Sequence, residues 1–221
     1  MAGQRNWTSR IAWLGCAAQI LFALNVLVSG LVAPNYDFFN NDTSDLGAKT
    51  SPNALPYNIA LSVSGLMSFC VAVALARTLE KSRLRTAGVV LIGVFSTGQF
   101  IDGIAREDCP VSVDTSCRAA EKAGEVSIMH VTHNVESLFT FSALMLAPII
   151  LAFAFQRVET YRGLFRPSLA AGVIQLICLP IFLGMYSVGA GGQGAVEIAE
   201  FLVGVAWLAA VSRRAALVSA G

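Results

Sequence analysis

The sequence predicts an all-α, polytopic membrane protein, a bundle of about six transmembrane helices. Composition is the first reason: of 221 residues, 55% are hydrophobic and 13% are charged, and the mean hydropathy is +0.65. Soluble domains carry roughly 25% charged residues. The second reason is that the apolar residues form long runs, each close to the 20 or so residues that cross a bilayer.

The expected spans cover residues 11–33, 55–76, 86–105, 126–155, 168–188 and 195–212. The third and the sixth are at the short end for spanning helices, which suggests that polar neighbours or local thinning of the bilayer help them to span. The first run is longer than the apolar core of a cleavable signal, roughly 7–15 residues, so we expect it to remain as a helix. No linker or repeat divides the chain, and we expect one domain over residues 1–221.

The basic residues predict the orientation of the bundle. They gather before the first span, in the second and fourth loops and after the sixth span: Arg5, Arg10, Arg77, Lys81, Arg83, Arg85, Arg157, Arg162, Arg166, Arg213 and Arg214. With six spans, all these segments fall on one side. Loops rich in Lys and Arg stay in the cytoplasm, so both termini are expected there.

Acidic residues lie inside or beside the apolar runs, where ionisable groups are costly and mark functional sites. Asp102 lies in the third run, Glu136 in the fourth, and Glu197 and Glu200 near the start of the sixth. A helix rises about 1.5 Å per residue, which places these groups between the midplane and the non-cytoplasmic surface. A buried carboxyl without a paired cation tends to keep its proton. The sequence therefore predicts neutral acids that face one apolar pocket.

The fourth run carries a polar stripe of His130, His133, Glu136 and Thr140, spaced three or four residues apart on one helix face. Lipid offers no hydrogen bonds, so the stripe must face the bundle interior. Three interpretations stay open. Glu136 with a histidine could transfer protons, His130 and His133 with a carboxylate could bind zinc, or the stripe could join helices by hydrogen bonds.

Other polar and aromatic residues on the same side are expected to contact a substrate: Asp45, Asn58, Phe95, Gln99, Phe139, Tyr186 and Glu200. Cys109 and Cys117 lie in the third loop, on the expected outer face. That compartment is oxidising, so a disulfide between them is plausible, with two free thiols as the alternative.

Short motifs resemble a bacterial membrane family labelled domain of unknown function nine-nine-eight. They are T-S-D-L-G-A at residues 43–48, N-x-x-L at 58–61, G-Q-F-I-D at 98–102, the His133 region and the loop D-C-P-V-S-V-D-T-S-C at 108–117. The resemblance implies a multi-pass protein of about six helices in a bacterial plasma membrane, without a settled activity. The positions of this chain that match the family pattern, and that the resemblance singles out, are Ser44, Asp45, Gly47, Asp102 and His133.

Our leading functional hypothesis is a terpene (meroterpenoid) cyclase that takes a hydrophobic small molecule from the bilayer and needs no cofactor. The chain is similar in size, helix count and intramembrane carboxyls to small membrane-bound terpene cyclases, an analogy of chemistry. Asp102, Glu136 or Glu197 would protonate an alkene or epoxide of an isoprenoid chain, and His133 would tune the acid. Aromatic faces and exclusion of water would protect the carbocation.

Two alternatives remain. The first is a zinc-dependent lipid hydrolase, similar to alkaline ceramidases, which use three histidines, an aspartate and a serine; this chain has 2 histidines. The second is a non-enzymatic transporter or membrane scaffold, which would also use buried acids. No basic patch supports nucleic acid as a partner, so we expect none; the net charge of +1 does not bear on this.

Overall fold

The computed structural model describes residues 2–220 and confirms the all-α fold. Within these residues the chain forms helices and no strand. The α-helices are α1 (Ala2–Val32), α2 (Ala54–Thr78), α3 (Arg83–Asp102), α4 (Thr115–Ala123), α5 (Ile128–Gln156), α6 (Phe165–Val188) and α7 (Gln193–Ala220). Two 3₁₀ turns, η1 (Thr43–Gly47) and η2 (Glu159–Leu164), lie in the connections.

Six of these helices, all but α4, are long and apolar enough to cross a membrane within residues 2–220. α3 is the shortest span, with 20 residues, and it begins earlier than expected because the Ser82 side chain accepts a hydrogen bond from the amide of Arg85. The expectation of a short sixth span was wrong. α7 has 28 residues, since Arg213 and Arg214 end the apolar run but not the helix.

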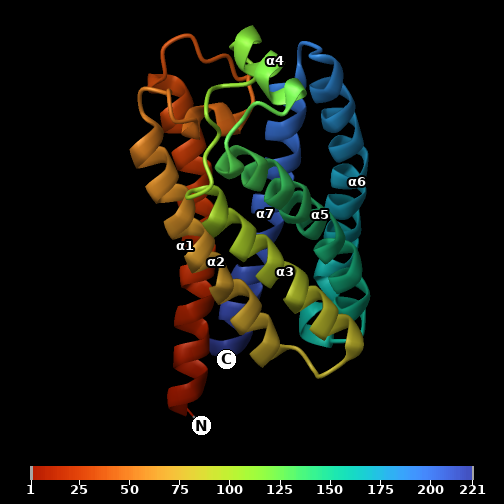
Figure 1. The fold of residues 1–221 in the computed structure, drawn as a ribbon. Coiled ribbons are helices and arrows are strands. Elements are labelled where there is room, and N and C mark those ends of the chain that lie inside the picture. Colours follow the sequence, from red (N-terminus) through yellow and green to blue (C-terminus); the bar gives the residue numbers. More distant parts are fainter. Residues whose placement is uncertain (1, 221) are drawn as a thin grey trace.

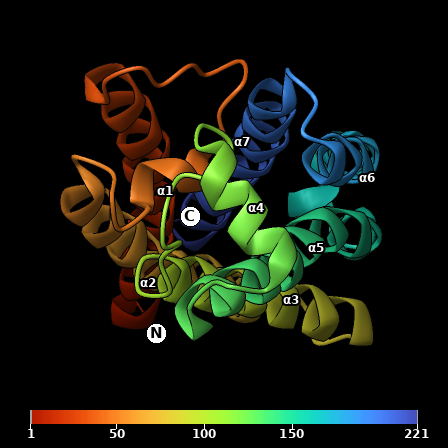
Figure 2. The same ribbon diagram turned by 45° about the horizontal axis from the view of Figure 1, so that its top comes forward.

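The spanning helices form a closed ring in the order α1, α2, α3, α5, α6, α7, with α7 also contacting α2. Both ends of the chain lie at one end of the bundle, and α4 lies at the other (Figure 1). Seen from that end, α4 lies across the ring of helices (Figure 2). We call the α4 end the outer end, following the orientation expected from the basic residues.

The two ends of the bundle differ in their interior. The inner end is filled by apolar side chains such as Leu75, Ile92, Leu151, Phe155, Leu208 and Val211. The outer end instead holds buried polar residues, among them Asp42, Gln99, Glu107, His133 and Glu197. The inner end can therefore supply the packing that holds the ring together, while the outer end is free to carry a site.

Glycine permits the close approach of α2 to α3. A Cβ on Gly65 would lie 2.5 Å from the backbone nitrogen of Phe100 and 2.8 Å from the carbonyl carbon of Gln99. Backbone atoms cannot rotate away as a flexible side chain can. Gly93, on α3, has open space where its Cβ would be.

Replacing Gly65 by Ala should therefore destabilise the protein, by about 1–3 kcal/mol for an overpacked helix contact. Replacing Gly93 by Ala should leave stability unchanged or raise it by up to about 1 kcal/mol, because alanine favours the helix. The two melting temperatures in one detergent provide the comparison. Equal melting temperatures for the two variants would contradict the tight crossing.

Candidate functional site

The outer half of the bundle encloses a cavity of about 260 Å³ that all six spanning helices and η1 line. Its polar wall consists of Asp42, Thr43, Ser44, Gln99, Asp102, Glu107, His133, Asn134, Ser137, Thr140 and Glu197. Its apolar wall consists of Phe22, Tyr57, Phe95, Leu138, Phe141, Leu144, Leu179, Phe182, Leu183, Tyr186 and Phe201. The cavity is thus amphipathic.

His133, on α5, lies between two carboxyl groups. Its Nδ1 is 2.7 Å from Oδ1 of Asp102, at the end of α3, and 3.1 Å from the carbonyl oxygen of Ala105. Its Nε2 is 3.6 Å from Oε1 of Glu107. Donation from Nδ1 to Asp102 and Ala105 fixes the ring, so that Nε2 faces Glu107.

Glu107 is buried in the loop that follows α3. The amide of Lys49 donates to its carbonyl oxygen at 2.9 Å, and the Ser44 hydroxyl donates to Oε1 at 3.3 Å. Its other oxygen, Oε2, has no hydrogen-bond partner among the described residues. Burial raises the pKa of Glu107 to about 8, although His133 opposes the shift.

A second pair of acids, Asp42 and Glu197, also belongs to the polar wall. Glu197, on α7, accepts from the backbone amide and from the hydroxyl of Thr43, each at 2.7 Å. Asp42 accepts from Nε2 of Gln193 at 2.8 Å. Burial, reinforced by the nearby carboxyls of Glu197 and Asp45, raises the pKa of Asp42 to about 9. At neutral pH, Asp42 and Glu107 therefore hold their protons.

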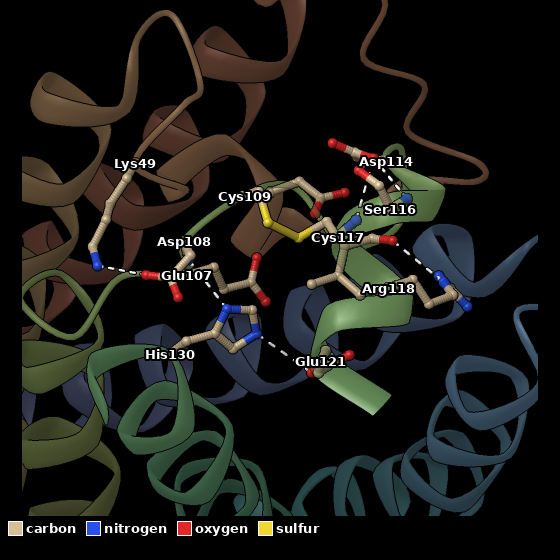
Figure 3. Close-up of a disulfide and its surroundings, with 12 residues drawn as sticks. Lys49, Glu107, Asp108, Cys109, Asp114, Ser116, Cys117, Arg118, Glu121 and His130 are labelled. Atoms are coloured by element: carbon tan, nitrogen blue, oxygen red, sulfur yellow. Dashed lines mark hydrogen bonds and ion pairs between the residues drawn. A yellow bond between two sulfur atoms is a disulfide. The ribbon is translucent and has the colours of Figure 1, made fainter. Parts of the chain in front are cut away.

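α4 covers the outer end and is held by a disulfide and by polar contacts (Figure 3). Cys109 and Cys117 are joined as a disulfide, which ties the first turn of α4 to the loop after α3. Glu121 of α4 accepts from Asn134 of α5 at 2.6 Å and from the Tyr186 hydroxyl of α6 at 2.7 Å. Arg118 donates to the carbonyl oxygen of Tyr186 at 3.3 Å.

The structure brings several of the sequence-predicted residues to the cavity. Those that line it are Phe95, Gln99, Asp102, His133, Tyr186 and Glu197. Glu136 lies next to it, because its Oε2 accepts a hydrogen bond at 2.8 Å from Thr140, which lines the wall.

Four predicted residues lie away from the cavity wall. Asp45 accepts from the amide and the hydroxyl of Ser112, which joins the first and third loops. Asn58 donates to the carbonyl of Gly47 at 2.8 Å and so holds η1. Glu200 is fully buried, with neither carboxyl oxygen hydrogen-bonded to a described residue. Phe139 is 63% exposed on the outside of α5.

Sequence reasoning missed Asp42, Thr43, Glu107 and Glu121. Thr43 is the first residue of the T-S-D-L-G-A motif and Asp42 directly precedes it, so the motif itself was a signal for them. Glu107 lies five residues after Asp102 in a polar loop, where nothing in the local pattern predicts burial.

Asp102, His133 and Glu136 each place one ligand atom within 4.8 Å of the other two. One imidazole and two carboxylates form a donor set that zinc accepts. His130 is not part of this group: its Nδ1 accepts from the amide of Asp108 at 3.1 Å, and its Nε2 is 3.4 Å from Glu121.

The raised carboxyl pKa values predict a pH dependence of stability. Burial also raises the pKa of Asp45, to about 6, despite its bonds to Ser112. In the unfolded chain carboxyls titrate near pH 4. Between these values the folded state binds more protons than the unfolded state. The free energy of unfolding therefore falls as pH rises and Asp42, Asp45 and Glu107 lose their protons.

The melting temperature should therefore fall from about pH 5 to about pH 9, and Asp42→Asn should flatten the upper part of this slope. Asp108 cannot reverse the trend. Although partial burial opposes it, bonds from Lys49 and Ser127 hold the pKa of Asp108 well below its usual value, so its contribution changes only in acid. A melting temperature that rises with pH over this range would contradict burial of these acids.

Comparisons with curated proteins and with solved structures found no match to the chain. A comparison with family models matched residues 16–214 to the family described as "Protein of unknown function (DUF998)". The match covers most of the 221 residues, including α2, α3, α5 and α6 in full. It bears out the resemblance read from the sequence motifs, and the chain belongs to this family.

Proposed function

We propose that the cavity is the active site of an integral membrane cyclase, which starts cyclisation by protonating an alkene or epoxide of an isoprenoid chain. One observation carries the proposal: carboxyl groups from separate elements meet at the outer end of a cavity whose remaining wall is apolar and aromatic. An acid beside an enclosed hydrocarbon surface is the arrangement that such a reaction requires.

Glu107 is our candidate for the proton donor. Its Oε2 is buried and has no hydrogen-bond partner among the described residues, so a proton on this oxygen is not shared with another described side chain. The contacts with Ser44 and His133 fix the opposite oxygen, Oε1. His133 is a positioning residue, which Asp102 orients in turn. Asp42 and Glu197 form a second acid pair across the wall.

The apolar wall suits the carbocation that protonation would create. Phe22 and Phe201 pack with ring centroids 4.6 Å apart, and Phe141 and Phe182 with centroids 6.5 Å apart. The faces of aromatic rings attract cations. The buried side chain of Phe95 extends the wall inward, where few polar groups could capture the cation.

The reaction can be tested with purified protein in lipid nanodiscs, incubated in D₂O with prenylated phenols and polyprenyl alcohols. A deuteron adds to an alkene carbon, a carbon–carbon bond forms, and a proton leaves an adjacent carbon. The cyclic product therefore keeps the substrate formula with one hydrogen replaced by deuterium. Cyclic, deuterated product that is absent from protein-free nanodiscs would support the proposal; unchanged substrate across the panel would oppose it.

A zinc-dependent lipid hydrolase is the second candidate, favoured by the grouping of Asp102, His133 and Glu136. Zinc would supply an activated water there. The test is elemental analysis of protein purified without chelator. Stoichiometric zinc that is lost in Asp102→Asn, together with release of fatty acid from lipids, would favour the hydrolase over the cyclase.

A further inference from the structure

Two of the residues that line the cavity are also exposed on the surface of the bundle, one on α5 and one on α6. Of all the residues that line it, Leu138 and Leu183 alone are large hydrophobic side chains with high exposure, at 49% and 42%. Leu138 lies on α5 and Leu183 on α6. Both lie within membrane-spanning segments, so the surface they share faces lipid rather than water.

The two helices lie close at their inner ends and diverge toward the outer end (Figure 1). At the inner end, Gly172 of α6 packs against Ile149 of α5, and Phe153 and Phe165 have ring centroids 6.0 Å apart. At the outer end, Glu121 of α4 bridges them through its hydrogen bonds to Asn134 and Tyr186. Between the inner contact and this bridge, Phe141 of α5 and Phe182 of α6 have ring centroids 6.5 Å apart, and the cavity-lining Leu138 and Leu183 are exposed.

The aqueous side of the cavity is covered. α4 lies across it and is tied down by the disulfide between Cys109 and Cys117. The loop before α4 is joined to the first loop through Ser112 and Asp45, and the first loop is joined to α7 through Thr43 and Glu197. A ligand from water would have to break these contacts, whereas a ligand from lipid would displace apolar side chains of α5 and α6, Leu138 and Leu183 among them.

We propose that the cavity takes its ligand sideways from the outer leaflet, between Leu138 and Leu183. The ligand is then a lipid-phase molecule with a single hydrocarbon chain, and its polar end lies under α4 against the carboxyl groups. This inference deepens the proposed function and rests on the same cavity, but loading through this opening does not require that cyclisation follows.

The test measures loading directly, with a polyprenyl alcohol that carries a diazirine and an alkyne, partitioned into nanodiscs. In the unaltered protein, photolabelling should fall on the α5 and α6 segments that line the cavity.

Leu138→Trp and Leu183→Trp should each slow labelling about tenfold, because the larger rings crowd the opening. Leu138→Ala and Leu183→Ala should speed it. Leu176→Trp is the matched control, since Leu176 is an exposed α6 residue two turns inward that does not line the cavity.

Further readouts separate this inference from its rivals. Loading is measured without turnover, so a protein that cyclises no substrate but loads the probe at a rate that the tryptophan variants slow leaves the lateral opening standing. Reduction of the disulfide should leave the loading rate unchanged. Monodisperse tryptophan variants that load normally would overturn the proposal, and so would loading that accelerates on reduction. A tryptophan variant that lowers final occupancy without slowing the rate would also overturn it, because the ring would then only fill the cavity.

Discussion

Glu107→Gln should lower turnover by about 10²–10⁴-fold, the usual contribution of a positioned general acid. The amide keeps the shape of the side chain and can still accept the bond from the Ser44 hydroxyl. What it lacks is the proton that burial holds on the carboxyl, whose pKa is about 8. Deuterium incorporation into the cyclic product over time is the measurement.

Glu200→Gln is the matched control. Glu200 is as deeply buried as Glu107, and neither of its carboxyl oxygens has a hydrogen-bond partner among the described residues, yet it does not line the cavity. It should keep nearly full turnover. A purely structural role for Glu107 would lower the melting temperature of Glu107→Gln but leave the pH profile of the remaining activity in place. If both variants cyclise the substrate equally well, Glu107 is not the donor.

The pH profile gives a second check on the same residue. In the unaltered protein, turnover should fall as pH rises past about 8, because the cavity loses its proton donor. In Glu107→Gln that fall should disappear. A fall at the same pH in both proteins would assign the donor to another acid, with Asp42 as the next candidate because its pKa lies near 9.

Hydropathy predicted the spanning helices well, because a run of apolar residues and a helix in lipid obey the same constraint. Hydropathy did not predict the end of a helix that is longer than its apolar run: α7 continues past Arg213. It also could not show α4, whose nine residues are polar. Local signals for that helix were nevertheless present: Asp114 accepts from the amides of Ser116 and Cys117, and Gly124 ends the helix with φ of 72°.

Some residues of the site could be predicted because they interrupt an apolar run, and others could not because they lie in polar loops. Asp102, His133 and Glu197 were found because a charge inside an apolar run is conspicuous. Glu107 lies between Arg106 and Asp108, in a loop that looks solvated, and only the fold of the two outer loops over the bundle buries it. Glu200 shows the opposite case: its position in the run resembles that of Glu197, but one turn of the helix places it away from the cavity wall.

Removing the disulfide, by Cys109→Ser together with Cys117→Ser, should have the second large effect. Closing a short loop of this kind contributes about 2–3 kcal/mol in the chain-entropy description. The remaining links from α4 to the helices below it include the polar contacts of Arg118 and Glu121, which water can replace. Opening should therefore be local, and amide exchange should rise across residues 115–123 while the spanning helices stay protected.

Removing the disulfide should also change the products of the reaction. A cover that opens admits water to the carbocation, so the double variant should convert part of its product from the cyclic alkene to the corresponding alcohol, heavier by one water. Cys178→Ser, which removes a thiol from α6 outside the cavity wall, should keep the product ratio of the unaltered protein. An unchanged ratio in the double variant, alongside raised exchange in α4, would show that α4 does not exclude water from the reaction.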